Sequence, residues 1–138
     1  MGTEDFKMKE MPEVSRMLRT GYVIELDEKR YFSGWRAKRI CTGIVERARY
    51  FSKMGQAERY ARQKLGFIGL RIHICRVCWT LVETESLEDS WRLIKEKGDA
   101  VRFSTYEEAK NYQRENSLWR TTMIERYTFR EKDVSLAA

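Results

Sequence analysis

A thirteen-residue pattern occurs twice in this chain, and it constrains the fold more than any other feature. Residues 48–60 read ARYFSKMGQAERY, and residues 100–112, 52 positions later, read AVRFSTYEEAKNY. In both copies Phe precedes a helical period, Ser is placed to cap it, Ala permits close helix-on-sheet approach, and Tyr lies one turn further along the same face. We therefore expect two helices that start in the same way.

Strand patterns flank both copies. Residues 22–26 and 30–35 predict a hairpin before the first helix, for which Ser52 is the expected cap and Gly66 the expected stop. Residues 71–82 (RIHICRVCWTLV) are apolar on both faces, as in the central strand of a sheet. Residues 91–95 and 118–129 predict strands on either side of a second helix. Capping-box spacing occurs twice at its start, at Thr105 with Glu108 and at Ser104 with Glu107.

These elements predict an α+β fold of two ββαβ-like repeats, with a mainly antiparallel sheet and two principal helices packed on it. One ββαβ unit of this size buries too little to be stable alone, so the two must share a core. The expected N-terminal extension, 1–21, contains a short helix opened by Pro12. The first module is 22–82, with a basic insertion at 36–47; the second module is 83–130, and the tail is 131–138. The insertion is either a loop or a short strand around Ile40 and Ile44.

Positive charge is concentrated in one stretch of the chain. The net charge is +6, from 27 Lys or Arg and 21 Asp or Glu. Residues 29–64 contain 11 Lys or Arg and two acids, so this stretch carries +9 and the remainder carries −3. Such asymmetry indicates an anionic partner for one face: nucleic acid, or a protein surface that normally holds it.

Arginine and aromatic residues are interleaved within this stretch. The guanidinium fork suits phosphate contacts, and aromatic rings stack on bases. The competing interpretation is that the charges only solvate an exposed face while the aromatics fill the core. Residues Arg120, Arg126 and Arg130 add a weaker basic face on the last strand. The candidate contact residues are Trp35, Arg36, Lys38, Arg39, Arg47, Arg49, Arg59 and Arg62.

No motif predicts catalysis, a cofactor or a metal. Cys75 and Cys78 form a CxxC pair, but they lie within a predicted strand and therefore point to opposite faces, unlike zinc ligands on a tight turn. A redox CxxC lies at a helix start, which this pair does not. His73 is the only histidine, which removes most hydrolase triads. We expect a protein without enzymatic activity, cofactor or metal, whose cysteines pack in the core.

The hairpin at 22–35, the pattern A-x-x-F-[ST]-x-x-x-x-A-x-x-Y at 48–60 and 100–112, and the strand at 91–95 resemble small accessory proteins of phages and bacterial mobile elements. This resemblance covers about half of the chain, and its motif specifies packing, so it carries no site residues across. Some small phage proteins of this kind are anti-CRISPR or other anti-defence inhibitors, and the resemblance implies such a role here.

Three functions follow. The leading one is a non-catalytic phage or mobile-element protein that inhibits a host nucleic-acid-handling defence complex, such as a CRISPR effector, through its basic face. The alternative is a direct DNA- or RNA-binding module, and the third is a structural protein that pairs through a strand edge. With no apolar span, no secretory signal and three cysteines, the expected compartment is the host bacterial cytoplasm, away from membranes.

Overall fold

The computed structural model describes residues 18–66, 71–84 and 93–134. The predicted short helix opened by Pro12 lies outside these residues, as do most of the acidic connector and positions 135–138 of the expected tail. The elements, in chain order, are β1 (Gly21–Asp27), β2 (Arg30–Arg36), β3 (Arg39–Gly43), the 3-10 helix η1 (Val45–Arg47), α2 (Met54–Lys64), β4 (Ile72–Glu83), β5 (Lys95–Glu96), β6 (Asp99–Ala100), α3 (Tyr106–Glu115) and β7 (Thr122–Val134).

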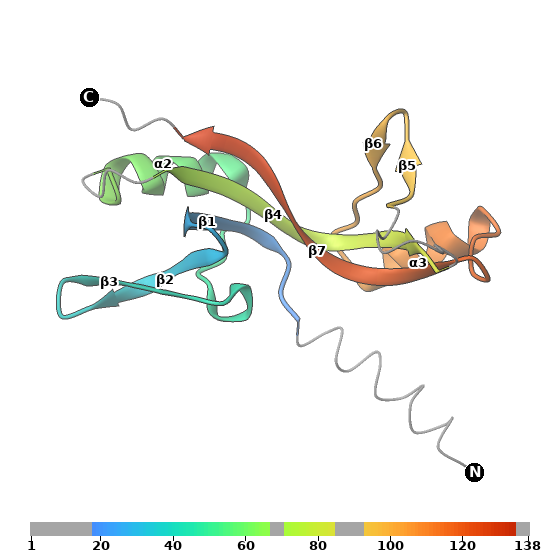
Figure 1. Ribbon diagram of the computed structural model, residues 1–138, viewed down its shortest axis with the longest axis horizontal. Helices are drawn as coiled ribbons and strands as arrows, with labels where there is room; N and C mark the ends of the chain where they lie inside the picture. Colours follow the sequence, from blue (N-terminus) through green and yellow to red (C-terminus); the bar gives the residue numbers. More distant parts are fainter. Residues whose placement is uncertain (1–17, 67–70, 85–92, 135–138) are drawn as a thin grey trace, which may run out of the picture.

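The fold is α+β: one five-stranded antiparallel sheet with two helices packed on it, as the sequence predicts (Figure 1). The strand order is β3-β2-β1-β4-β7, and β4 is paired on both sides, which confirms it as a central strand. β4 and β7 form the long axis of the molecule and pair along twelve residues of β4. The remaining strands, β5 and β6, form a separate two-stranded hairpin.

The sheet opens between β1 and β2, and the chain itself fills the gap. β1 and β2 pair only beside their connecting turn, at Glu25↔Tyr31 and Asp27↔Arg30. Beyond that point the segment before α2 lies between them: Tyr22 and Phe51 exchange backbone hydrogen bonds of 2.8 and 2.7 Å, and the Arg49 N–H donates to the Phe32 carbonyl over 2.9 Å. The β2–β3 hairpin is thereby displaced from the main sheet (Figure 1).

Both faces of the sheet around β1 are covered. On one face α2 buries Ala57, Ala61 and Leu65 against strand residues such as Ile24, Phe32 and Ile74. The opposite face holds a smaller cluster that η1 and its flanking residues cover: Val23, Tyr31, Ala48, Cys75 and Val77. Successive side chains of a strand point to opposite faces, so these two clusters follow directly from the unbroken apolar runs of β1 and β4.

At the other end, α3 packs on the distal halves of β4 and β7. Trp79 and Phe103 exchange two backbone hydrogen bonds of 2.8 Å each, and the Ile94 N–H donates to the Leu81 carbonyl over 2.9 Å. β1 pairs with one edge of β4, and further along that same edge β4 bonds to the segments at residues 103 and 93–94. Of the predicted strand at 91–95, positions 91–92 lie outside the described residues, Leu93 forms an isolated bridge with Val82, and β5 begins at Lys95.

The repeated sequence pattern produces the same local geometry twice. Phe51 and Tyr60 have ring centroids 5.5 Å apart at 49°, and Phe103 and Tyr112 have centroids 5.2 Å apart at 50°. Ala57 and Ala109 are fully buried beneath the two helices. The larger prediction of two ββαβ modules is not confirmed, because β5 and β6 stay out of the sheet that β1 and β2 join.

Three further expectations differ from the structure. The N-cap of α2 is Lys53 rather than Ser52, whose hydroxyl lies 2.9 Å from Gln56 Oε1, whereas the predicted cap Thr105 accepts the Glu108 N–H of α3. β7 runs over 122–134 rather than 118–129, so positions 131–134 are strand and not tail. The insertion at 36–47 contains β3, which confirms the expected short strand around Ile40, but Ile44 lies outside this strand and precedes η1.

Candidate functional site

The end of the β2–β3 hairpin carries three cations in four residues. Arg36 and Arg39 face each other as the last cross-strand pair, and Ala37 and Lys38 form the two-residue turn between them with φ of 48° and 66°. Both turn residues are in the left-handed region, as the commonest two-residue hairpin turn requires. Like charges directly opposite each other are unfavourable in a sheet. This charge density therefore adds nothing to hairpin stability.

An exposed aromatic cluster lies beside this hairpin end. Trp35 is 41% exposed and its indole Nε1 donates to the Tyr60 hydroxyl over 2.8 Å. Phe32 contacts both rings, with centroids 6.0 Å from Trp35 and 5.4 Å from Tyr60. The Arg49 guanidinium is stacked 4.5 Å from the Tyr60 ring centroid. We call Trp35, Tyr60 and Arg49 the aromatic shelf.

The predicted contact residues divide between two faces. Trp35 and its cross-strand partner Ile40 lie on the α2 side of the hairpin, so Arg36 and Arg39 lie on the opposite side. Arg47 belongs to η1, which also covers that opposite face. The hairpin end with Arg36 and Arg39 therefore meets the aromatic shelf only at the edge of the hairpin. Arg47 lies on the η1 side, away from the aromatic shelf.

One predicted residue on α2, Arg62, lies away from the hairpin. Arg62 pairs with Glu58 over 3.6 Å, and Lys132 of β7 donates to the same carboxylate over 2.8 Å. Arg62 is therefore on the β7 side of the helix, whereas Tyr60 faces the hairpin. Arg59 is exposed. The site that the structure assembles, which we call the basic hairpin, consists of Trp35, Arg36, Lys38, Arg39, Arg49 and Tyr60.

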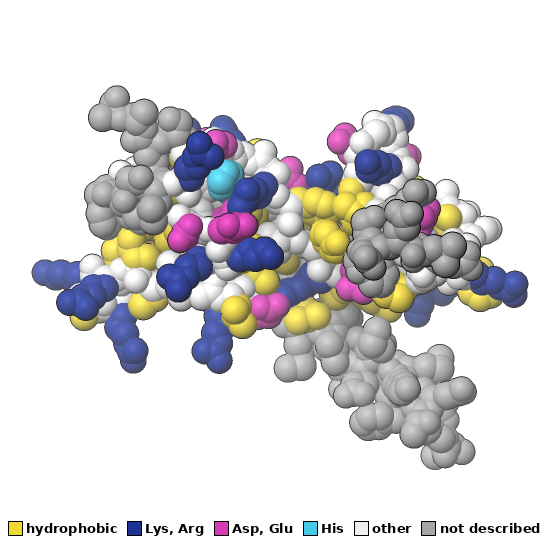
Figure 2. All heavy atoms as spheres, viewed as in Figure 1, with side chains coloured by type: hydrophobic (Ala, Val, Ile, Leu, Met, Phe, Trp, Pro, Cys, Tyr) yellow, Lys and Arg dark blue, Asp and Glu magenta, His cyan; other side chains and the backbone are white. Residues whose placement is uncertain are grey.

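The two acids of the basic stretch are both engaged away from the basic hairpin. Glu46 accepts from Arg126 of β7 over 3.1 Å. Glu58 is held by Lys132, whose hydrogen bond is the main reason that the pKa of this carboxyl is lowered. Within 18–66, 71–84 and 93–134, the ion pairs include neither Arg36, Lys38 nor Arg39. Their positive charge therefore has no acidic partner among these residues, and Lys and Arg side chains project from this end of the molecule (Figure 2).

Sequence reasoning missed a buried ionic cluster on β1, β4 and β7. The carboxylate of Glu25, 3% exposed, accepts from Arg130 Nε over 2.8 Å and from the Lys29 N–H over 2.9 Å. His73 Nδ1 lies 3.4 Å from the same carboxylate. The signal was an acid inside the apolar run of β1, because an acid in a buried strand position needs a partner. The Glu25 oxygens are already occupied, so the cluster acts structurally.

The weaker basic face predicted on the last strand does not form. Arg120 lies in the turn before β7, while Arg126 and Arg130 are bound by Glu46 and Glu25. Two of these three cations are therefore neutralised by acids that are 80 and 105 residues away in sequence. This face offers little free positive charge.

Cys75 and Cys78 lie in the interior of β4, as predicted, and both are free thiols. Burial is the largest cause that raises the pKa of Cys75 to about 12 and also raises the pKa of Cys78. Both thiols therefore stay protonated near neutral pH, where only a thiolate acts as nucleophile or metal ligand. The described part of the chain contains no group of three or more His, Cys, Asp or Glu side chains able to hold a metal ion.

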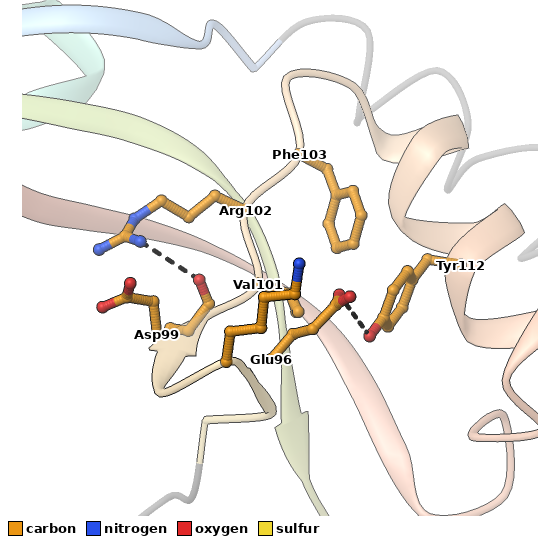
Figure 3. Close-up of a pocket in the computed structure, with 8 residues that line it drawn as sticks. Glu96, Asp99, Val101, Arg102, Phe103 and Tyr112 are labelled. Carbon is orange, nitrogen blue, oxygen red and sulfur yellow. Dashed lines mark hydrogen bonds between the residues drawn. The ribbon is translucent and has the colours of Figure 1, made fainter.

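A pocket of about 330 Å³ lies between the β5–β6 hairpin and α3 (Figure 3). Phe103 and Tyr112 form its aromatic wall, and the Tyr112 hydroxyl donates to Glu96 Oε2 over 3.1 Å. Asp99 and Arg102 line it from the hairpin side, where Arg102 Nη1 donates to the Ala100 carbonyl over 3.2 Å. The charged residues that line this pocket are of both signs, unlike those of the basic hairpin.

No protein-family model matches the chain, and neither the curated proteins nor the solved structures include a significant match. None of the helices over the described ranges has the length and apolar character needed to cross a bilayer.

Proposed function

We propose that this protein is a non-catalytic binding protein whose basic hairpin contacts the phosphates and bases of a nucleic acid. The observation that carries the proposal is the pairing of the acids: Glu46 and Glu58 neutralise Arg126 and Lys132, leaving the cations of the hairpin end without partners among the described residues. Uncompensated cations next to an exposed ring are the combination that single-stranded nucleic acid requires.

The composition of the site favours nucleic acid over an acidic protein groove. Three of its cations are arginines, whose planar fork binds phosphate in a bidentate way. Trp35 is exposed, yet its hydrogen bond to Tyr60 and its contact with Phe32 hold it in place. A fixed ring loses little freedom when a base stacks on it, whereas an acidic groove would need only the charges.

The test is a titration of the protein against labelled duplex DNA, single-stranded DNA and RNA at two salt concentrations. We expect binding that weakens steeply with salt, because each phosphate contact releases counterions. The variant Arg36→Glu with Arg39→Glu should lower the log–log salt slope for single strands by about 1.4, since each contact contributes about 0.7. The control Lys95→Glu with Lys97→Glu makes the same charge change on the β5–β6 hairpin and should bind like wild type.

A single variant separates binding from folding. Arg39→Glu places a carboxylate directly opposite Arg36, so an attractive pair replaces a repulsive one. This change should stabilise the fold by about 0.2–1 kcal/mol in denaturant titration while it weakens binding. Unchanged affinity in both hairpin variants would rule out the site.

The inhibitor role stays a separate proposal, and the same titration distinguishes it. A protein that binds none of the three nucleic acids contradicts direct binding and points to an acidic protein groove. In that case a pull-down with nucleoprotein defence complexes, lost in the Arg36→Glu and Arg39→Glu variant, would support an anti-defence inhibitor.

A further inference from the structure

Trp119 is 59% exposed, more than any of the other described tryptophans. It lies in the turn between α3 and β7, where its ring borders a groove of about 280 Å³. The side chains of Lys110, Gln113 and Arg114 on α3 form the rest of this groove. A tryptophan exposed singly on a surface needs no explanation, but this ring borders a groove whose other walls carry two cations, and that combination points to a ligand.

The turn that carries Trp119 is held rigidly. Leu118 is its anchor: its N–H donates to the Gln113 carbonyl over 2.8 Å, and its own carbonyl accepts from Thr122 Oγ1 over 2.7 Å. The Gln113 side-chain amide donates to both the carbonyl and the hydroxyl of Thr122, over 3.1 and 3.0 Å. These bonds fix the backbone on both sides of Trp119, so the turn holds this residue at the surface, and a ligand there meets a preorganised turn.

Among the described residues, the cations around Trp119 have no acidic partner. The Arg120 guanidinium is stacked 4.5 Å from the Trp119 ring centroid. Within the described parts of the chain, the ion pairs include none of Lys110, Arg114 and Arg120. Figure 2 shows Lys or Arg side chains beside hydrophobic surface at this end. The charge of the groove is thus complementary to phosphate.

We propose that Trp119, Arg120, Lys110 and Arg114 form a second contact for single-stranded nucleic acid, in which an unpaired base stacks on the indole and the cations hold the neighbouring phosphates. This inference rests on the proposed function and extends it to the opposite end of the molecule. α3 and the β2–β3 hairpin lie at opposite ends of the β4–β7 pair (Figure 1). One strand of sufficient length binds both ends, and a short oligonucleotide reaches only one.

The experiment measures anisotropy of fluorescein-labelled oligo(dT) and oligo(U), 6 and 30 nucleotides long, with wild type, Trp119→Ala and Trp119→Phe. Loss of one stacked base should weaken binding of the 30-nucleotide strand by about tenfold in Trp119→Ala. Trp119→Phe keeps a ring and should stay within about threefold of wild type. A second measurement follows tryptophan fluorescence. Bound oligonucleotide should quench this fluorescence in wild type, and less so in Trp119→Phe, because phenylalanine has no indole emission. Lys95→Glu is the control for Arg120→Glu, which should also weaken binding.

The two proposals fail in distinguishable ways. If Trp119→Ala binds the long strand like wild type while Arg36→Glu with Arg39→Glu does not, the second contact is overturned and the basic hairpin stands. If Trp119→Ala loses affinity and the hairpin variant does not, the second contact stands without the first. A preference for the long strand that is equal in wild type and Trp119→Ala would also overturn the second contact.

Discussion

The two copies of the repeated pattern begin alike and end differently. In both, a Phe pairs through its backbone with a strand, a Tyr packs on that Phe, and an Ala is buried beneath the helix. The second halves diverge: α2 buries Ala61 and Leu65, whereas the corresponding positions of α3 are Gln113, which binds Thr122, and the exposed Ser117. A short motif therefore sets how a helix begins, and the strands beneath decide how it ends.

The largest difference between the copies should appear at Leu65. Its side chain is fully buried in the core beneath α2, so Leu65→Ala should cost about 2–5 kcal/mol of unfolding free energy. Ser117 has φ of 53°, where a residue with a Cβ is strained, so Ser117→Gly should change stability by less than about 1 kcal/mol. Denaturant titration measures both, and comparable losses would mean that the two helix ends are equivalent after all.

The helix starts should respond equally to the same change. Phe51 and Phe103 are both half-buried and each packs on one Tyr. Phe51→Ala and Phe103→Ala should each cost about 2 kcal/mol, below the ~3–5 of a fully buried ring. Thermal or urea unfolding of the two variants provides the comparison. A difference of several kcal/mol between the two losses would show that the two Phe–Tyr contacts contribute unequally to stability despite their similar geometry.

The smallest effect concerns the caps. Thr105 caps α3, while Lys53, at the matching position 52 residues earlier, leaves α2 without a side-chain cap. Thr105→Ala should lose about 1 kcal/mol, and Lys53→Thr, which copies the second helix into the first, should gain about 0.5–1 kcal/mol. Circular dichroism melts of the two single variants measure both shifts. No gain in Lys53→Thr would mean that another group already satisfies the first turn of α2.

The fold was predictable wherever a pattern is local. The strands at 22–26 and 71–82 and the two helices follow from periodicity and composition, and the structure confirms them, although the cap predicted for α2 is wrong. The placement of β5 and β6 was not predictable, because which segment occupies an edge of β4 depends on pairing between residues distant in sequence. β1 pairs with β4 over 73–77, whereas the segment before β5 reaches the same edge only through the isolated bridge between Leu93 and Val82.

The candidate site was only partly predictable for the same reason. Three of its cations, Arg36, Lys38 and Arg39, lie within four positions of the sequence, and the structure places all three at the hairpin end. Glu58 and Arg62 have i,i+4 spacing, a pattern that could have removed Arg62 from the list beforehand. The partnership of Glu46 with Arg126 spans 80 residues, and no local rule indicates it.

β7 is the last strand of the sheet order, and its outer edge has the features of a strand that resists aggregation. A β-bulge interrupts its ladder with β4 between Ile74 and Cys75, where Glu131 has no partner in the register. The exposed residues from 130 to 133 read Arg, Glu, Lys and Asp, so a chain approaching this stretch meets alternating charges on an irregular backbone. Irregular and charged edges discourage the strand-by-strand growth that leads to fibrils. A partner that joins by strand addition would have to overcome the same obstacle.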